Sequence, residues 1–145
     1  MFTIVKDKEY IAFTLVSEPS SIYPLVRRFE ELAPEWGISN SGRIALVLRE
    51  LLSDAVMRGT PQDGSRRVRC WVERTSEGPF KITVENEGGG LGFGFFNTSA
   101  PDALQNERGD GYALVRKVCR NLNLNARRNR VTALVDATET IGEEQ

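Results

Sequence analysis

The spacing of apolar and polar residues predicts a domain that mixes short strands with a few helices. Several short apolar runs, some of them alternating with polar residues, are typical of strands. These runs occupy residues 1–6, 10–17, 66–75, 80–86 and 130–137. Apolar residues three and four positions apart, as on one face of an amphipathic helix, recur elsewhere. These helix-type segments are residues 22–32, 40–59 and 111–122.

The order of these elements predicts the fold class. The strict alternation of strand and helix that builds a doubly wound parallel sheet is absent. We therefore predict an α+β fold: a two-layer sandwich, with about three helices on one face of a mixed, mostly antiparallel sheet. Residues 1–138 are expected to form a single domain, and residues 139–145 an acidic, frayed tail.

Capping residues and glycines indicate where the first two predicted helices begin and end. A helix near residues 22–32 is followed by Gly37, which can adopt the positive φ of a helix end. The second helix can be capped by Asn40 or Ser41, whose side chains accept hydrogen bonds from free backbone N–H groups. Gly59 is expected to close it.

The amino-acid composition excludes several classes of catalytic and metal site. The 145 residues include no histidine, which removes histidine bases, most zinc sites and an internal phospho-histidine. The formal net charge of −1 gives no general attraction to nucleic acid or to membranes. Cys70 and Cys119 lack metal-site spacing and are interpreted as buried thiols of a reducing compartment. Because no signal peptide or membrane span is apparent, we expect a cytoplasmic protein without a direct nucleic-acid partner.

Two carboxylates on the second predicted helix are the first candidate site. Glu50 and Asp54 lie four positions apart, so their side chains are neighbours beside the apolar stripe. They can form a solvated surface pair, in which Asp54 bonds to Arg58 one turn later. Alternatively, the pair faces a metal: one acid holds Mg²⁺, and the other orients or deprotonates a nucleophile.

A glycine-rich stretch after the strand at residues 80–86 is the second candidate site. Five of the seven residues at positions 88–94 are glycine, yet neither a P-loop nor a dinucleotide fingerprint fits. What remains is an N-x-G-x-G pattern that starts at Asn86. Strand alternation puts Asn86 on the same face as Ile82 and Val84, so a polar amide would end a buried face at the mouth of a pocket. The alternative is a flexible loop.

A second glycine pair, Gly109 and Gly111, opens the third predicted helix in "RGDGYALV". Free N–H groups at a helix N-terminus bind anions, so this is a candidate phosphate cradle. The alternative is that the two glycines only turn the chain.

The order of these three motifs along the chain is a more specific indication of a protein family than any one motif alone. "ELLSDAVMRG", "VENEGGG" and "RGDGYALV" resemble the N, G1 and G2 boxes of the GHKL (Bergerat-fold) ATPase superfamily. The run "IALVLRELLSDAVMRGT" looks most like the bacterial anti-sigma factor serine/threonine kinases in that superfamily. The resemblance spans roughly Ile44 to Leu134 and implies ATP and Mg²⁺ as cofactors.

The resemblance assigns roles to three polar residues. Glu50 matches the catalytic acid of the N box. Asp54 stands where the family usually has a magnesium-binding Asn, and a carboxylate can also ligate Mg²⁺. Asn86 stands where the family usually has an adenine-binding Asp, and its amide oxygen is a weaker acceptor than a carboxylate.

The resemblance also matches four glycines to the two glycine boxes of the family. Gly88 and Gly90 match the G1 box and Gly109 and Gly111 the G2 box, where backbone approaches the nucleotide. Arg108 is the nearest cation in a lid expected between the two boxes.

The function that the resemblance implies is that of an anti-sigma regulator. Such a protein binds a sigma factor and phosphorylates a serine or threonine of an anti-anti-sigma (STAS-type) partner, and a homodimer stays open. The alternative is a catalytically silent GHKL-fold module that keeps partner switching and has lost ATP turnover. A third reading is an unrelated α+β domain in which the three boxes are coincidental.

Overall fold

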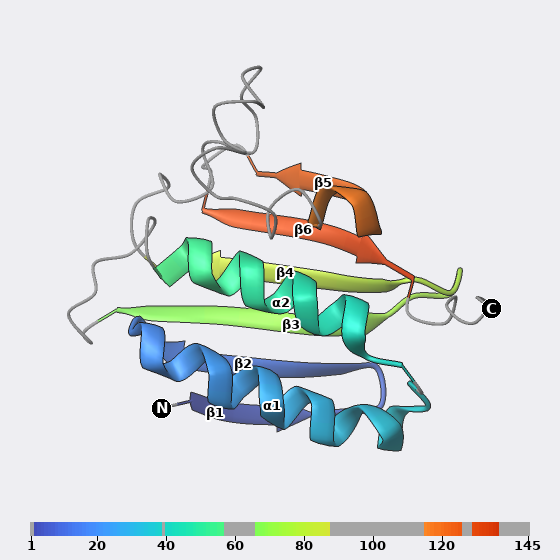
Figure 1. The fold of residues 1–145 in the computed structure, drawn as a ribbon, viewed down its shortest axis with the longest axis horizontal. Coiled ribbons are helices and arrows are strands. Elements are labelled where there is room, and N and C mark those ends of the chain that lie inside the picture. The colour runs from blue at the N-terminus through green and yellow to red at the C-terminus, as the bar shows by residue number, and fades with distance from the viewer. Residues whose placement is uncertain (1, 39, 57–65, 88–114, 126–128, 137–145) are drawn as a thin grey trace.

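The fold is a two-layer α+β sandwich, with one antiparallel sheet and helices on one of its faces (Figure 1). A computed structural model describes residues 2–38, 40–56, 66–87, 115–125 and 129–136. The predicted fold class is confirmed. None of the helices in these ranges is long and apolar enough to cross a membrane.

The sheet has six strands in the order β1-β2-β3-β4-β6-β5, and every neighbouring pair is antiparallel. The strands are β1 (Phe2–Lys6), β2 (Tyr10–Val16), β3 (Arg67–Arg74), β4 (Phe80–Asn86), β5 (Cys119–Leu124) and β6 (Arg130–Val135). The five predicted strands are therefore present. The sixth, β5, was not predicted.

Two α-helices lie across one face of this sheet (Figure 1). They are α1 (Ile22–Leu32) and α2 (Gly42–Asp54), with the short 3₁₀ segments η1 (Pro19–Ser21) and η2 (Ala33–Trp36) on either side of α1. The predicted end signal is confirmed, because Gly37 has a φ of 81° just after η2. Of the two predicted caps of α2, Ser41 occupies the N-cap position without a side-chain hydrogen bond, and Asn40, one residue earlier, accepts the Gly42 N–H at 3.0 Å. Gly59 lies outside the described residues.

The third predicted helix is wrong over the second half of its described length. Only residues 115–118 are helical there, and the chain then forms β5. Leu122 and Leu124 pair with Ala133 and Val131 of β6, on the apolar face of the sheet. The alternation of leucine with asparagine in "NLNLN" is a strand pattern, and asparagine is a poor helix former.

The core lies between the helices and this face. Phe13, Cys70, Val84 and Val131 pair across four strands in one row, and each is at most 1% exposed. Burial raises the pKa of the Cys70 thiol to about 12, so this sulfur stays protonated and unreactive at neutral pH. Cys119, half-buried on β5, has a pKa raised by burial to about 11. The expectation of buried thiols is confirmed for Cys70.

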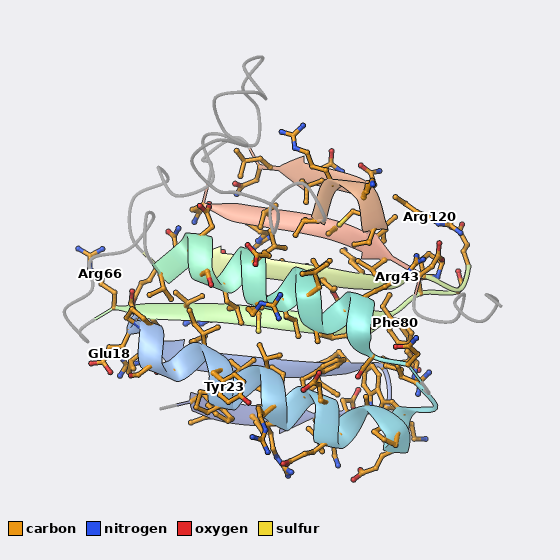
Figure 2. The ribbon with its side chains drawn as sticks, in the orientation of Figure 1. Glu18, Tyr23, Arg43, Arg66, Phe80 and Arg120 are labelled. Atoms are coloured by element: carbon orange, nitrogen blue, oxygen red, sulfur yellow. The ribbon has the colours of Figure 1, made fainter. Side chains whose placement is uncertain are left out.

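Arg74 joins three segments at the end of the sandwich where α2 begins. Its Nη2 donates to the Trp36 carbonyl at 2.8 Å, and its Nε donates to the Lys8 carbonyl at 3.1 Å. The guanidinium carbon lies 4.6 Å from the centre of the Trp36 ring. That ring stacks in turn on Phe80, with centroids 6.2 Å apart. Figure 2 labels Phe80 at this end of the sandwich. Arg74 therefore ties the β1–β2 turn and η2 to the end of β3.

We expect Arg74→Lys to lower the free energy of unfolding by about 1–2 kcal/mol, because an ammonium cannot reproduce the planar, two-pronged contact. Urea denaturation followed by circular dichroism measures the change. Arg69→Lys is the control: it lies on the same strand, and its side chain has no hydrogen bond or ion pair in the described structure. Its effect should stay within about 0.5 kcal/mol. Equal effects of the two substitutions would contradict this role for Arg74.

Candidate functional site

Asn86, the last residue of β4, is the most unusual polar residue of the core. It is 1% exposed and shares the helix-covered face with Ile82 and Val84, as strand alternation predicted. Its backbone N–H donates to the Asn129 carbonyl at 3.0 Å. Neither the oxygen nor the nitrogen of its side-chain amide, however, has a hydrogen-bond partner among the described residues. A buried polar group in this state costs about 1–3 kcal/mol, so the fold carries a group better suited to a ligand than to the core.

The two carboxylates of α2 differ in their surroundings. Asp54 is wholly buried, at 0% exposure, in the last turn of the helix. The side chain of Glu50, one turn earlier, is 19% exposed, and its Oε2 lies 3.7 Å from Arg49 Nε. The interpretation of these acids as a solvated surface pair is therefore wrong for Asp54. Arg58, its suggested surface partner, lies outside the described residues.

The topology brings Asp54 and Asn86 to the same end of the sandwich. The helix α2 packs on β4, and the two run so that the C-terminal end of each points the same way (Figure 1). A buried carboxylate and a buried amide therefore occupy one end of the layer between helix and sheet. The amide can recognise a donor and an acceptor on one edge of a ligand, and the carboxylate can hold a cation.

A divalent cation at this end would need oxygen ligands beyond those of the protein. Within the described ranges, no group of three or more His, Cys, Asp or Glu side chains could hold a metal. Mg²⁺ is commonly bound by only one or two carboxylates together with water and substrate phosphates, so Asp54 alone is compatible with such an ion.

The other predicted site residues follow β4 in the chain. Gly88, Gly90, Arg108, Gly109 and Gly111 all lie outside the described residues. Their roles as glycine boxes and lid cation stay predictions. Of the predicted site residues, the structure therefore places Glu50, Asp54 and Asn86.

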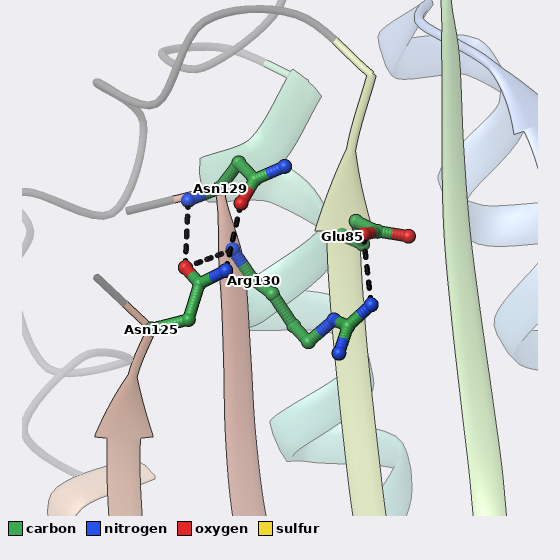
Figure 3. Close-up of polar contacts among 4 residues, drawn as sticks. All are labelled: Glu85, Asn125, Asn129 and Arg130. Carbon is green, nitrogen blue, oxygen red and sulfur yellow. Dashed lines mark hydrogen bonds and ion pairs between the residues drawn. The ribbon is translucent and has the colours of Figure 1, made fainter. Parts of the chain in front are cut away.

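A cluster at the β5–β6 connection supports Asn86 and was missed by sequence reasoning. Asn125 Oδ1 accepts the backbone N–H groups of Asn129 and Arg130, both at 3.0 Å, and Asn125 Nδ2 donates to Asn129 Oδ1 at 2.8 Å (Figure 3). This clasp holds the Asn129 carbonyl that accepts the Asn86 N–H. The signal was the pair of asparagines around the polar turn "ARR", because asparagine side chains often bond to nearby backbone in turns.

The chain was compared with known proteins. No model of a known protein family matches it. No curated protein matches it significantly. The candidate site therefore stands on its residues and their geometry.

We expect Asn86→Leu to raise the free energy of unfolding by about 1–2 kcal/mol. Leucine has nearly the shape of asparagine and buries no polar group at this position. Urea denaturation in the absence of nucleotide measures the change. The control is Asn121→Leu on the exposed side of β5, which should stay within about 0.5 kcal/mol. A clear loss of stability in Asn86→Leu would mean that the amide is satisfied in solution.

Proposed function

We propose that the chain binds ATP with Mg²⁺ at the end of the sandwich formed by Asn86 and Asp54. The observation that carries this proposal is the buried amide of Asn86, which has no hydrogen-bond partner in the described structure. An adenine edge offers an amino donor and a ring-nitrogen acceptor, which match the two halves of a side-chain amide. The resemblance of the flanking sequence to nucleotide-binding boxes supports the same ligand.

The two acids of α2 suit different roles in this proposal. Asp54, which is fully buried at the same end of the sandwich as Asn86, would hold Mg²⁺. Glu50 keeps 19% of its side chain exposed, so it can reach a hydroxyl group that arrives from solution on another protein. Glu50 would orient or deprotonate that serine or threonine hydroxyl. ATP would supply the phosphoryl group, and Mg²⁺ would offset its charge.

The wider role that we propose is that of a cytoplasmic anti-sigma regulator of the bacterial type. It would bind a sigma factor and phosphorylate a serine or threonine of an anti-anti-sigma (STAS-type) protein. The support is the order of the three boxes in the sequence and the α+β sandwich that the described residues form.

A second candidate function is a catalytically silent module of the same fold that only binds protein partners. Two residues favour it. Asn86 stands where the GHKL family usually has an Asp, and its amide oxygen is a weaker acceptor than a carboxylate. Asp54 stands where the family usually has an Asn, and it adds a negative charge that an amide does not carry. Both changes would weaken the binding of a polyanion with an adenine base.

Titration calorimetry with ATP, with and without Mg²⁺, tests the pocket before any partner is known. We expect Mg²⁺-dependent binding by the wild type and about fivefold tighter binding by Asn86→Asp, because a charged acceptor bonds the adenine amino group more strongly. The control is Asn123→Asp, the same change on exposed β5, which should leave affinity unchanged. If none of the three proteins binds ATP, the nucleotide proposal fails and the silent module takes its place.

For phosphoryl transfer, we expect Glu50→Gln to keep ATP affinity within about twofold and to lower transfer at least about a hundredfold, because it removes a base and preserves shape. Transfer of labelled γ-phosphate to a candidate anti-anti-sigma protein is the measurement. Glu30→Gln, an exposed acid on α1, is the matched control and should transfer like the wild type.

Asp54→Asn tests the metal role separately from the base. It recreates the usual N box and should keep Mg²⁺-dependent ATP binding, because an amide oxygen still ligates the ion and adds no charge beside the phosphates. Calorimetry with and without Mg²⁺ measures this. Loss of the Mg²⁺ dependence in Asp54→Asn alone would leave the ATP site standing and show that the carboxylate charge is required.

A further inference from the structure

The face of the sheet opposite the helices is a separate surface. Strand alternation places Arg67, Arg69, Trp71 and Glu73 of β3 on it, because Val68, Cys70 and Val72 are buried under the helices. Both described α-helices lie on the other face (Figure 1). We call this exposed side of β2, β3, β4, β6 and β5 the open face.

The charges on the open face are unevenly paired. Glu85 of β4 forms an ion pair with Arg130 of β6, at 3.0 Å between Oε2 and Nη2 (Figure 3). Glu87 Oε1 accepts the backbone N–H of Arg67 at 2.7 Å. The side chains of Arg67 and Arg69, by contrast, have no ion pair within the described part of the chain.

The same imbalance continues toward the other end of the face. Lys81 of β4 stands directly opposite Glu73 of β3, but no ion pair joins them at 4 Å or less in the described structure. Outside the Glu85–Arg130 pair, three cations without an ion pair to any described residue (Arg67, Arg69 and Lys81) stand against two carboxylates (Glu73 and Glu87), because a hydrogen bond from a neutral backbone N–H leaves the charge of Glu87 in place. Among the described residues, the open face therefore has a small excess of positive charge, and its two unpaired arginines lie two positions apart on β3, where they can pair with carboxylates.

Two hollows lie on the open face, on either side of the Glu85–Arg130 ion pair. The first, about 280 Å³, is lined by Arg67, Arg69, Glu85, Asn86, Glu87 and Asn129. The second, about 220 Å³, is lined by Trp71, Glu73, Lys81, Thr83, Arg130 and Thr132. One hollow thus holds two unpaired arginines, and the other an aromatic ring.

Trp71 is placed to receive an apolar side chain. Its cross-strand neighbours are Ala12 and Thr83, both small, so the half-buried indole forms one wall of the second hollow. Trp71 and Arg69 are two positions apart on one strand, or about 7 Å. A tryptophan next to arginines is the composition typical of the energetic centre of protein interfaces.

We propose that the open face binds an acidic segment of a partner protein. Carboxylates of the segment would pair with Arg67 and Arg69, and an adjacent apolar side chain would pack against Trp71. Glu73, Glu85 and Glu87 on the same face disfavour a continuous phosphate backbone such as that of a nucleic acid. A second copy of the chain is also disfavoured, because the described residues of its own open face carry more cations than carboxylates. This inference does not depend on nucleotide binding, which is proposed for the other side of the sheet.

The test uses the two tryptophans as separate reporters. In a ¹⁵N-labelled protein, Trp71 and the buried Trp36 each give one indole N–H signal, assigned with Trp71→Phe. The probe is a short synthetic peptide with one leucine between pairs of glutamates, titrated at low salt. We expect the Trp71 signal to move in a saturable way and the Trp36 signal to stay in place.

Two further peptides and two double variants separate specific binding from general charge attraction. Replacing the glutamates of the peptide by glutamines, or its leucine by alanine, should weaken binding at least about fivefold in each case. The Arg67→Gln/Arg69→Gln protein should bind the original peptide about tenfold more weakly. The control is Arg27→Gln/Arg28→Gln, which removes the same charge from the exposed side of α1 and should change affinity less than about twofold.

Four results would overturn the proposal. One is a Trp71 signal that does not move, and another is an equal loss of affinity in both double variants. The third is tighter binding of a single-stranded oligonucleotide than of the peptide at the same ionic strength, which would assign the face to nucleic acid. The fourth is a Trp71 signal that moves with protein concentration alone, which would assign the face to a second copy of the chain.

Discussion

The structure depends on covering one apolar face of the sheet. Phe13, Cys70, Val84 and Val131 form a row across four strands, and α1 and α2 close over it. Because successive residues of a strand point to opposite faces, this one requirement decides which side chains are inside along every strand. It places Asn86 in the core and Arg69 on the open face with the same certainty as it places Val84.

Asn86 is the point at which this apolar pattern is broken. The residue continues the buried series Ile82 and Val84, yet it brings a polar amide that no described residue satisfies. Groups of this kind reduce stability, and native proteins retain few of them without a use. Together with the buried Asp54 of α2, the amide makes this end of the layer more polar than the rest of the core, and we therefore propose it as a binding site.

One short connection links the two surfaces for which we propose functions. The Asn125 clasp positions Asn129, whose carbonyl accepts the N–H of Asn86 on the helix side. The next residue, Arg130, is held by the same clasp and pairs with Glu85 on the open face. The start of β6 is thus a shared support, so a change in the clasp would disturb both surfaces together.

Much of the architecture was predictable from local sequence. The alternation in five strands, the limits of α1, the Asn40 hydrogen bond at the start of α2 and the turn at Gly37 were all visible as patterns, because they depend on neighbouring residues and backbone preferences. The inward direction of Asn86 was also predictable, since period-two alternation needs no knowledge of the partner strand.

Tertiary structure decided the rest. Residues 119–124 join the sheet because Leu122 and Leu124 find Ala133 and Val131 on β6, a contact that local helix spacing cannot reveal. The same holds for Asp54, which four-residue spacing left open between surface and site, and which packing of α2 on the sheet buried completely. The sequence by itself determined which residues could share a face. Only the packing of segments far apart in the sequence decided which faces of the strands and helices were buried, because burial depends on contacts with residues outside each local segment.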